Sequence, residues 1–158
     1  MMELEVIDVS WSQRNAVIYN DKDDCYELNS SKDKRLSEFG FYCIYGAHPV
    51  YGPDVLLYIG ETKASKKSKR SFAVRFDEHF KGRFWYHQNL SYSTGIADKK
   101  LTNDKIQIIE SILIAAHKPA LNRDHIDCAK EGSERYLVRN WDFPGGLQFE
   151  CSGGYWRQ

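Results

Sequence analysis

Six polar side chains in this chain carry the groups that phosphodiester hydrolysis requires: Tyr42, Tyr58, Arg75, His79, Glu110 and Asn122. A carboxylate binds a divalent cation through oxygen, and a guanidinium fork matches the oxygens of a phosphate. A phenol next to an imidazole can exchange a proton with it. If the fold gathered these side chains at one place, they could carry out metal-dependent cleavage of a phosphodiester.

Each of these residues also has an ordinary structural interpretation when it is taken alone. Tyrosines such as Tyr42 and Tyr58 commonly fill a half-exposed strand face. Arg75 and His79 are four residues apart and would be neighbours on the surface of a helix. Asn122 follows Pro119-Ala120-Leu121 and would suit a turn or a cap.

Glu110 gives the independent physical indication of a site. On a helical wheel it lies between Ile106 and Ile114, away from any polar face. Burying a carboxylate there is costly unless another group pairs with it. It would either meet a lysine or arginine, or sit at the edge of the core, or face a cleft and bind a divalent cation. Taken alone, the structural interpretation is favoured.

The elements that would position these residues are visible as local patterns. Residues 40–45 and 54–59 are β-branched and aromatic runs bounded by Gly and Pro, which predicts a β-hairpin. Ser71 would cap a helix over residues 72–81, in which a phenylalanine recurs every four residues. A second helix, capped near Thr102, would end at Lys118-Pro119 and is apolar on most of its circumference.

The flanking segments add strands on both sides of this region. Residues 3–8 and 15–19 read as short strands, and a polar stretch follows over 20–38. The tail predicts two further strands around Pro144-Gly145-Gly146. We therefore expect a single α+β domain, with a small central antiparallel sheet flanked by helices, an N-terminal β extension and a C-terminal β-hairpin.

Composition excludes few functions. The chain has 158 residues, and its 22 Lys and Arg balance its 22 Asp and Glu, so global charge does not indicate a nucleic-acid partner. A local basic run is the candidate nucleic-acid contact, formed by Lys63, Lys66, Lys67, Lys69 and Arg70. A solvated loop face explains such a run equally well. 

The remaining features of the sequence are unremarkable for a reduced, cytoplasmic protein. The four cysteines are widely spaced and show no zinc-binding pattern. The N-terminus lacks the basic start and apolar run of a signal peptide, and we expect no membrane partner.

The ordered set of residues resembles the active site of the GIY-YIG nucleases. Gly40-Phe41-Tyr42 and Tyr58-Ile59-Gly60 match the two tyrosine motifs, and the other four residues follow in the family's order. The resemblance covers residues 39–123 and leaves 1–38 and 124–158 outside. Two departures are Phe41 in place of an aliphatic residue and a longer segment around Pro49 to Pro53.

The resemblance implies a role for each residue. Glu110 would hold one Mg²⁺ or Mn²⁺, and Arg75 would contact the non-bridging phosphate oxygens. Tyr42 would be the general base, assisted by the metal, by Arg75 or by proton transfer to His79. Tyr58 would position water or phosphate, and Asn122 would support the site. The partner would be DNA, with a double-stranded substrate expected.

Two other classes of function remain open on the sequence. One is a catalytically inactive nucleic-acid-binding module on the same scaffold, and the other is a structural or protein-interaction domain. Restriction, homing, repair and phage-related roles are all compatible, and a restriction role would predict a homodimer. His87 and His117 are extra candidates, for which we favour a structural role. Gly60 is expected to let the backbone bend away after Tyr58.

Overall fold

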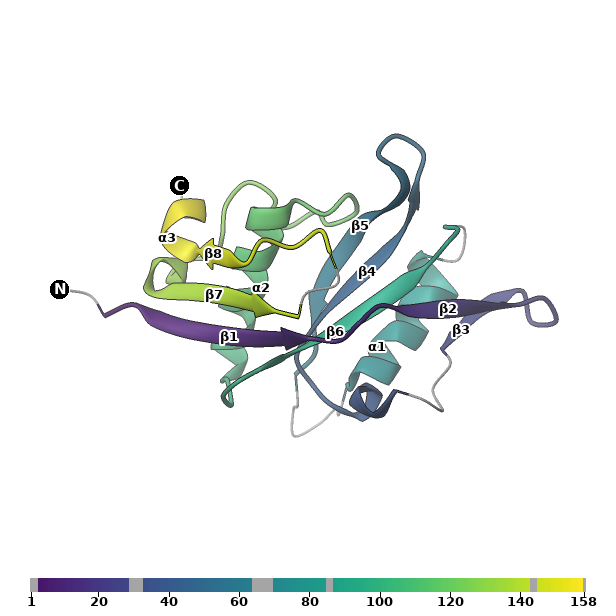
Figure 1. Ribbon diagram of the computed structural model, residues 1–158, viewed down its shortest axis with the longest axis horizontal. Helices are drawn as coiled ribbons and strands as arrows, with labels where there is room; N and C mark the ends of the chain where they lie inside the picture. Colours follow the sequence, from purple (N-terminus) through teal and green to yellow (C-terminus); the bar gives the residue numbers. More distant parts are fainter. Residues whose placement is uncertain (1–2, 29–32, 64–69, 85–86, 143–144, 158) are drawn as a thin grey trace.

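The computed structural model describes residues 3–28, 33–63, 70–84, 87–142 and 145–157. Within these ranges the chain is α+β, with one mixed sheet and helices on both of its faces (Figure 1). The strands are β1 (Glu5–Trp11), β2 (Asn15–Asn20), β3 (Cys25–Leu28), β4 (Phe41–His48), β5 (Gly52–Glu61), β6 (Ser91–Ala97), β7 (Tyr136–Trp141) and β8 (Glu150–Ser152). The helices are α1 (Phe72–Glu78), α2 (Asn103–His117) and α3 (Gly153–Trp156), with short helical turns η1 (Lys34–Ser37), η2 (His79–Arg83) and η3 (Ser133–Arg135).

Strand β6 is the centre of the sheet. One of its edges pairs with β4, and the other pairs with β1 and β2, which follow one another along it. Beyond these, β5 pairs with β4, β3 with β2, and β7 with β1. Figure 1 shows β1 and β2 as one long run of strand across the molecule.

The prediction of an antiparallel sheet is wrong in one pairing. Strands β1 and β7 are parallel, in register from Glu5 opposite Tyr136 to Ser10 opposite Trp141, so the sheet is mixed. The chain passes through α2 before it reaches β7. The local sequence pattern of β7 therefore does not show which strand β7 pairs with. The tail does form an antiparallel pair, β7 with β8, but β8 has only three residues and continues into α3.

Strand β6 was not predicted, because its sequence, SYSTGIA, is rich in small and polar residues. The structure shows why these residues are needed. A Cβ on Gly95 would lie 2.9 Å from the ring of Trp11, so only glycine lets the ring pack there. The hydroxyl of Ser93 donates to the carbonyl of Ser12 at 2.7 Å. Packing against neighbouring strands therefore makes this segment a strand, although its own sequence does not favour one. The same holds for β3, which lies in the segment that was expected to be a polar stretch without strands.

The two faces of the hairpin strands enter two different cores, because side chains alternate along a strand. Phe41, Cys43, Tyr45 and Ile59 pack with the apolar face of α2. Tyr42 and Ile44 pack on the opposite face, with the phenylalanines of α1. Both helices begin where the sequence predicts: Ser71 precedes α1, and the hydroxyl of Thr102 accepts the amide of Lys105 at the start of α2.

The free edge of β5 is covered by the segment that follows α2. Lys118 ends the helix in the left-handed conformation, with φ of 46°. The amides of Ala120 and Leu121 then donate to the carbonyls of Leu56 and Leu57, at 3.2 and 2.8 Å. This brings α2 and its C-terminal loop from one face of the sheet to the strand that carries Tyr58.

Across the part of the chain that the structure describes, every helix is too short or too polar to cross a lipid bilayer.

Candidate active site

The two tyrosines of the hairpin lie on the same face of the sheet. In the register of β4 and β5, Tyr42 is opposite Gly60 and Ile44 is opposite Tyr58, so the two phenols are diagonal neighbours. Their ring centroids are 6.1 Å apart. The register shifts just before Tyr58, leaving Leu57 as an extra residue in β5, and such bulges re-aim adjacent side chains.

Gly60 makes room for the hydroxyl of Tyr42. A Cβ built on Gly60 would lie 2.3 Å from that hydroxyl oxygen, closer than any real contact. The backbone there has no positive φ, and Gly60 pairs regularly with Tyr42. The expected role of Gly60 in bending the backbone is therefore wrong; the absent side chain matters, because the phenol occupies its place.

We expect Gly60→Ala to move the Tyr42 phenol and to lower the free energy of unfolding by about 1–3 kcal/mol, the usual cost of overpacking a core. Urea unfolding followed by fluorescence measures the loss. Gly82→Ala is the matched control, because a Cβ there meets no atom within 4 Å. Equal unfolding midpoints for the Gly60→Ala and Gly82→Ala proteins would contradict this interpretation.

Tyr42 is hydrogen-bonded to His79 and lies near Arg75. Its hydroxyl oxygen is 2.7 Å from Nε2 of His79 and 3.5 Å from Nη2 of Arg75. His79 starts η2, a π-helical turn closed by the bond from the Phe84 amide to the His79 carbonyl. The predicted helix thus changes form at His79, and π-helical turns are frequent at functional sites.

The phenol of Tyr42 is fully buried, and burial raises its pKa above the ordinary value of tyrosine. The adjacent Tyr58 acts in the same direction, whereas the charge of Arg75 opposes it. A phenolate at this position therefore needs a direct proton acceptor, and Nε2 of His79 is within hydrogen-bonding distance. Tyr58 is close to the same imidazole, with ring centroids 5.0 Å apart.

Arg75 is held by an acidic neighbour as well as by the phenol. Its Nη1 lies 2.7 Å from Oε2 of Glu78, and Arg70 lies 2.7 Å from the other oxygen of the same carboxylate. The expected nucleic-acid contact Arg70 is therefore placed next to Arg75 by a shared ion pair. Because Arg70 and Glu78 are both well exposed, this pair is weak and easily exchanged for a phosphate.

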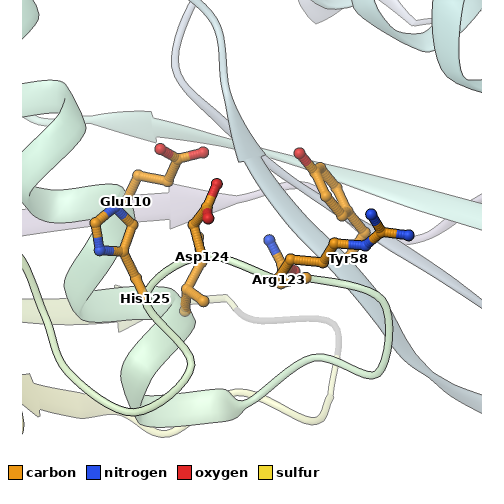
Figure 2. A pocket seen from close by; sticks show the side chains of 7 residues that line it. Tyr58, Glu110, Arg123, Asp124 and His125 are labelled. Atoms are coloured by element: carbon orange, nitrogen blue, oxygen red, sulfur yellow. The ribbon is translucent and has the colours of Figure 1, made fainter.

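Glu110 lies in a cavity of about 400 Å³ between α2, β5 and the loop after α2 (Figure 2). The cavity is lined by Tyr58, Glu110, Ile114, Asn122, Arg123, Asp124 and His125. In the described ranges, the Glu110 carboxylate has no hydrogen-bond or ion-pair partner, so the expected alternative of a pair with a lysine or arginine is not found there. Burial raises the pKa of Glu110 to about 7, and the nearby Glu61 contributes in the same direction.

Asn122 supports the site from the edge of the sheet. Its Oδ1 accepts the amide of Ile59 at 2.9 Å, and its Nδ2 donates to the carbonyl of Ile59 at 2.9 Å. The side chain thus replaces a neighbouring strand at this residue of β5. This bond pair positions the loop that follows Asn122 next to Tyr58.

The structure therefore brings the predicted residues together in two adjoining groups. Tyr42, Arg75 and His79 form a bonded set, Glu110 and Asn122 lie around the edge of β5, and Tyr58 belongs to both. Arg123, Asp124 and His125 were missed by the sequence analysis, although they directly follow Asn122. The available signal was the unbroken polar run from Asn122 to His125, and the resemblance, which covers residues 39–123, ends within it.

The lysines of the basic run are only partly placed. Lys63 is 3.4 Å from Oε1 of Glu61, and its charge lowers the pKa of Glu110. Lys66, Lys67 and Lys69 lie outside the described residues.

The two extra histidines lie outside this cavity. Nδ1 of His117 donates to the carbonyl of Leu113 at 2.7 Å, and Nε2 accepts the amide of Gln148 at 2.8 Å. These bonds use both ring nitrogens of a neutral imidazole, and burial lowers the pKa of His117. His87 lines a separate hollow at the base of the β4–β5 hairpin tip.

Comparisons with protein-family models, with curated proteins and with solved structures found no match. The resemblance to GIY-YIG nucleases therefore rests on the ordered residues of the sequence alone.

The residues around Glu110 suit a cation that keeps much of its water. In the part of the chain described, no three His, Cys, Asp or Glu side chains converge as a metal site. Mg²⁺, however, is typically held by one or two carboxylates together with water and substrate phosphates. Among the described residues the Glu110 carboxylate has no protein partner, so its oxygens fit a Mg²⁺ or Mn²⁺ that is otherwise held by water and phosphate.

Proposed function

We propose that this protein is a metal-dependent endonuclease of the GIY-YIG type that hydrolyses phosphodiester bonds of DNA. One observation carries the proposal: the carboxylate of Glu110, which has no partner among the described residues, shares a cavity with Tyr58, and Tyr58 lies beside the bonded set of Tyr42, Arg75 and His79. A carboxylate, two phenols, a guanidinium and an imidazole at one sheet edge are the groups that this reaction needs.

The chain's own residues would divide the work as follows. Tyr42 would pass its proton to Nε2 of His79 and, as a phenolate stabilised by Arg75, take a proton from the attacking water. Arg75 would leave its partly exposed ion pair with Glu78 to bind the non-bridging oxygens of the phosphate. Tyr58 would position water or phosphate at the cavity wall. A Mg²⁺ or Mn²⁺ held by Glu110 would neutralise charge on the phosphate and support the leaving oxygen.

A catalytically inactive nucleic-acid-binding module is the second candidate, and one observation favours it. The Tyr42 phenol is fully buried, and Arg75 is paired with Glu78, so neither is presented to substrate in this conformation. An active enzyme would have to open this side of the site when DNA binds.

A cleavage assay on supercoiled plasmid tests the proposal. With Mg²⁺ or Mn²⁺ we expect the wild type to form nicked or linear DNA, and EDTA to stop the reaction. Arg75→Ala should reduce the rate by about 10²–10³-fold, because a group that stabilises the transition state is lost. Arg135→Ala, the removal of an exposed arginine outside the site, should leave the rate unchanged.

The same experiment separates the alternatives. DNA binding without cleavage would favour the inactive module, and neither activity on duplex, single-stranded, branched or RNA substrates would favour a structural or protein-interaction domain. The pattern across these substrates would also show which nucleic acid is cut, and gel filtration would test the homodimer that a restriction role predicts.

A further inference from the structure

The loop that follows Asn122 is held at both ends. On one side, Asn122 is bonded twice to the backbone of Ile59. On the other, the ammonium of Lys118 donates to the carbonyl of Ile126. Between these attachments, His125 adopts a positive φ of 63°, which turns the chain sharply. Asp124 is thus carried by a short loop with fixed ends, and its position relative to β5 is set by the fold.

The carboxylate of Asp124 points into the cavity, toward that of Glu110 (Figure 2). Glu110 reaches this cavity from α2, and Asp124 reaches it from the loop after α2. Within the described residues Asp124 has no hydrogen-bond or ion-pair partner, as is also true of Glu110. Arg123 lines the same cavity and Asp124 is exposed, but among the described residues no cationic side chain forms an ion pair with either carboxylate. A cation bound between two facing carboxylates removes their mutual repulsion.

We infer that Asp124 is a second carboxylate ligand of this site, which holds a divalent cation together with Glu110 before any nucleic acid binds. The inference rests on the proposed function, which assigns the cation to Glu110 alone. Asp124 lies beyond residues 39–123, so the resemblance gives it no role. Two carboxylates with water in the remaining positions are a usual arrangement for Mg²⁺.

Two neighbours are less suitable as the second ligand. Glu61 also acts on the charge of Glu110, but it does not line the cavity, and its Oε1 is 3.4 Å from the ammonium of Lys63. His125 lines the cavity, but its imidazole offers nitrogen, which a hard cation such as Mg²⁺ prefers less than carboxylate oxygen.

Calorimetric titration of the full-length protein with Mn²⁺, without DNA, tests this inference. We expect the wild type to bind the ion, and Asp124→Asn to weaken the affinity by at least about 10-fold, the scale on which cation sites respond to lost carboxylate support. Asp127→Asn is the matched control, because it removes an exposed carboxylate from the same loop outside the cavity, and we expect it to change the affinity by less than about 2-fold. Unfolding in EDTA shows that each variant is folded.

Cleavage at graded Mn²⁺ gives a second readout. Asp124→Asn should cleave slowly at low Mn²⁺ and recover as the ion concentration rises, because Glu110 remains. Wild-type affinity in Asp124→Asn, or loss of affinity in Glu61→Gln instead, would overturn the inference while leaving cleavage by the wild type intact. Wild-type cleavage without Mn²⁺ binding in the absence of DNA would also overturn it. Failure of the wild type both to bind Mn²⁺ and to cleave any substrate would overturn the proposed function as well.

Discussion

Glu110→Gln should abolish cleavage and still give a folded protein. We expect the rate of plasmid cleavage to fall by about 10³-fold or more, since a neutral amide cannot replace the carboxylate that holds the cation. Mn²⁺ should raise the melting temperature of the wild type, because it binds the folded state, and should leave that of Glu110→Gln unchanged. Glu131→Gln, the same substitution at an exposed position, should behave as the wild type in both measurements.

The same substitution should stabilise the metal-free protein at alkaline pH. Burial raises the pKa of Glu110 from 4.5 to about 7. Between these values the unfolded chain has released the proton that the folded protein retains, so stability falls as pH rises through this window. Glutamine cannot ionise, so in EDTA at pH 8 the variant should be more stable than the wild type by up to about 3 kcal/mol.

Urea unfolding in EDTA at pH 4 and pH 8 measures this difference. The gain should be absent at pH 4, where Glu110 is protonated in the folded protein and largely so in the unfolded chain. An equal effect of Glu110→Gln at both pH values would show that its carboxylate is not destabilised by burial. Unchanged cleavage in Glu110→Gln would remove Glu110 from the site altogether.

Tyr42→Phe should lower turnover by about 10²–10⁴-fold, the contribution of a positioned general base, and leave the affinity for DNA close to that of the wild type. The ring would keep its contacts with Phe76 and Tyr58, and only the hydroxyl that bonds His79 and Arg75 would be lost. Single-turnover cleavage and equilibrium binding separate the two quantities. Near-wild-type turnover in this variant would remove Tyr42 from the role of base.

Two further variants make this test specific. Tyr92→Phe removes another hydroxyl from the same core, one that donates to Asp33 at 3.1 Å, and should change stability without changing turnover. If His79 accepts the proton of Tyr42, His79→Gln should slow turnover as well. The double variant should then be little slower than either single one, because the two residues act as a unit.

The sequence predicted those helices and strands whose signals lie within their own residues. The hairpin, the starts of both helices and the N-terminal strands were predicted, because alternation and apolar periodicity lie within each segment. Thr102 caps α2 as expected, whereas the hydroxyl of Ser71 makes no capping hydrogen bond to α1. Strand β6 and the parallel pairing of β1 with β7 could not be predicted. Glycine is needed at position 95 because the ring of Trp11 packs against it. The partner of β7 depends on the path of the chain through α2.

The amino-acid sequence shows which chemical groups are present and in what order, and its periodicity places a carboxylate at position 110 on an apolar helix. The packing of the elements shows three things that the sequence does not. Among the described residues the Glu110 carboxylate has no protein partner, the Tyr42 phenol occupies the space that a side chain at Gly60 would need, and Asp124 faces Glu110. The spacing of apolar residues along one helix or strand predicts which of its own side chains are buried. Whether a buried charge is paired depends on which other element packs against it, and here a loop bonded to the free edge of β5 provides that neighbour.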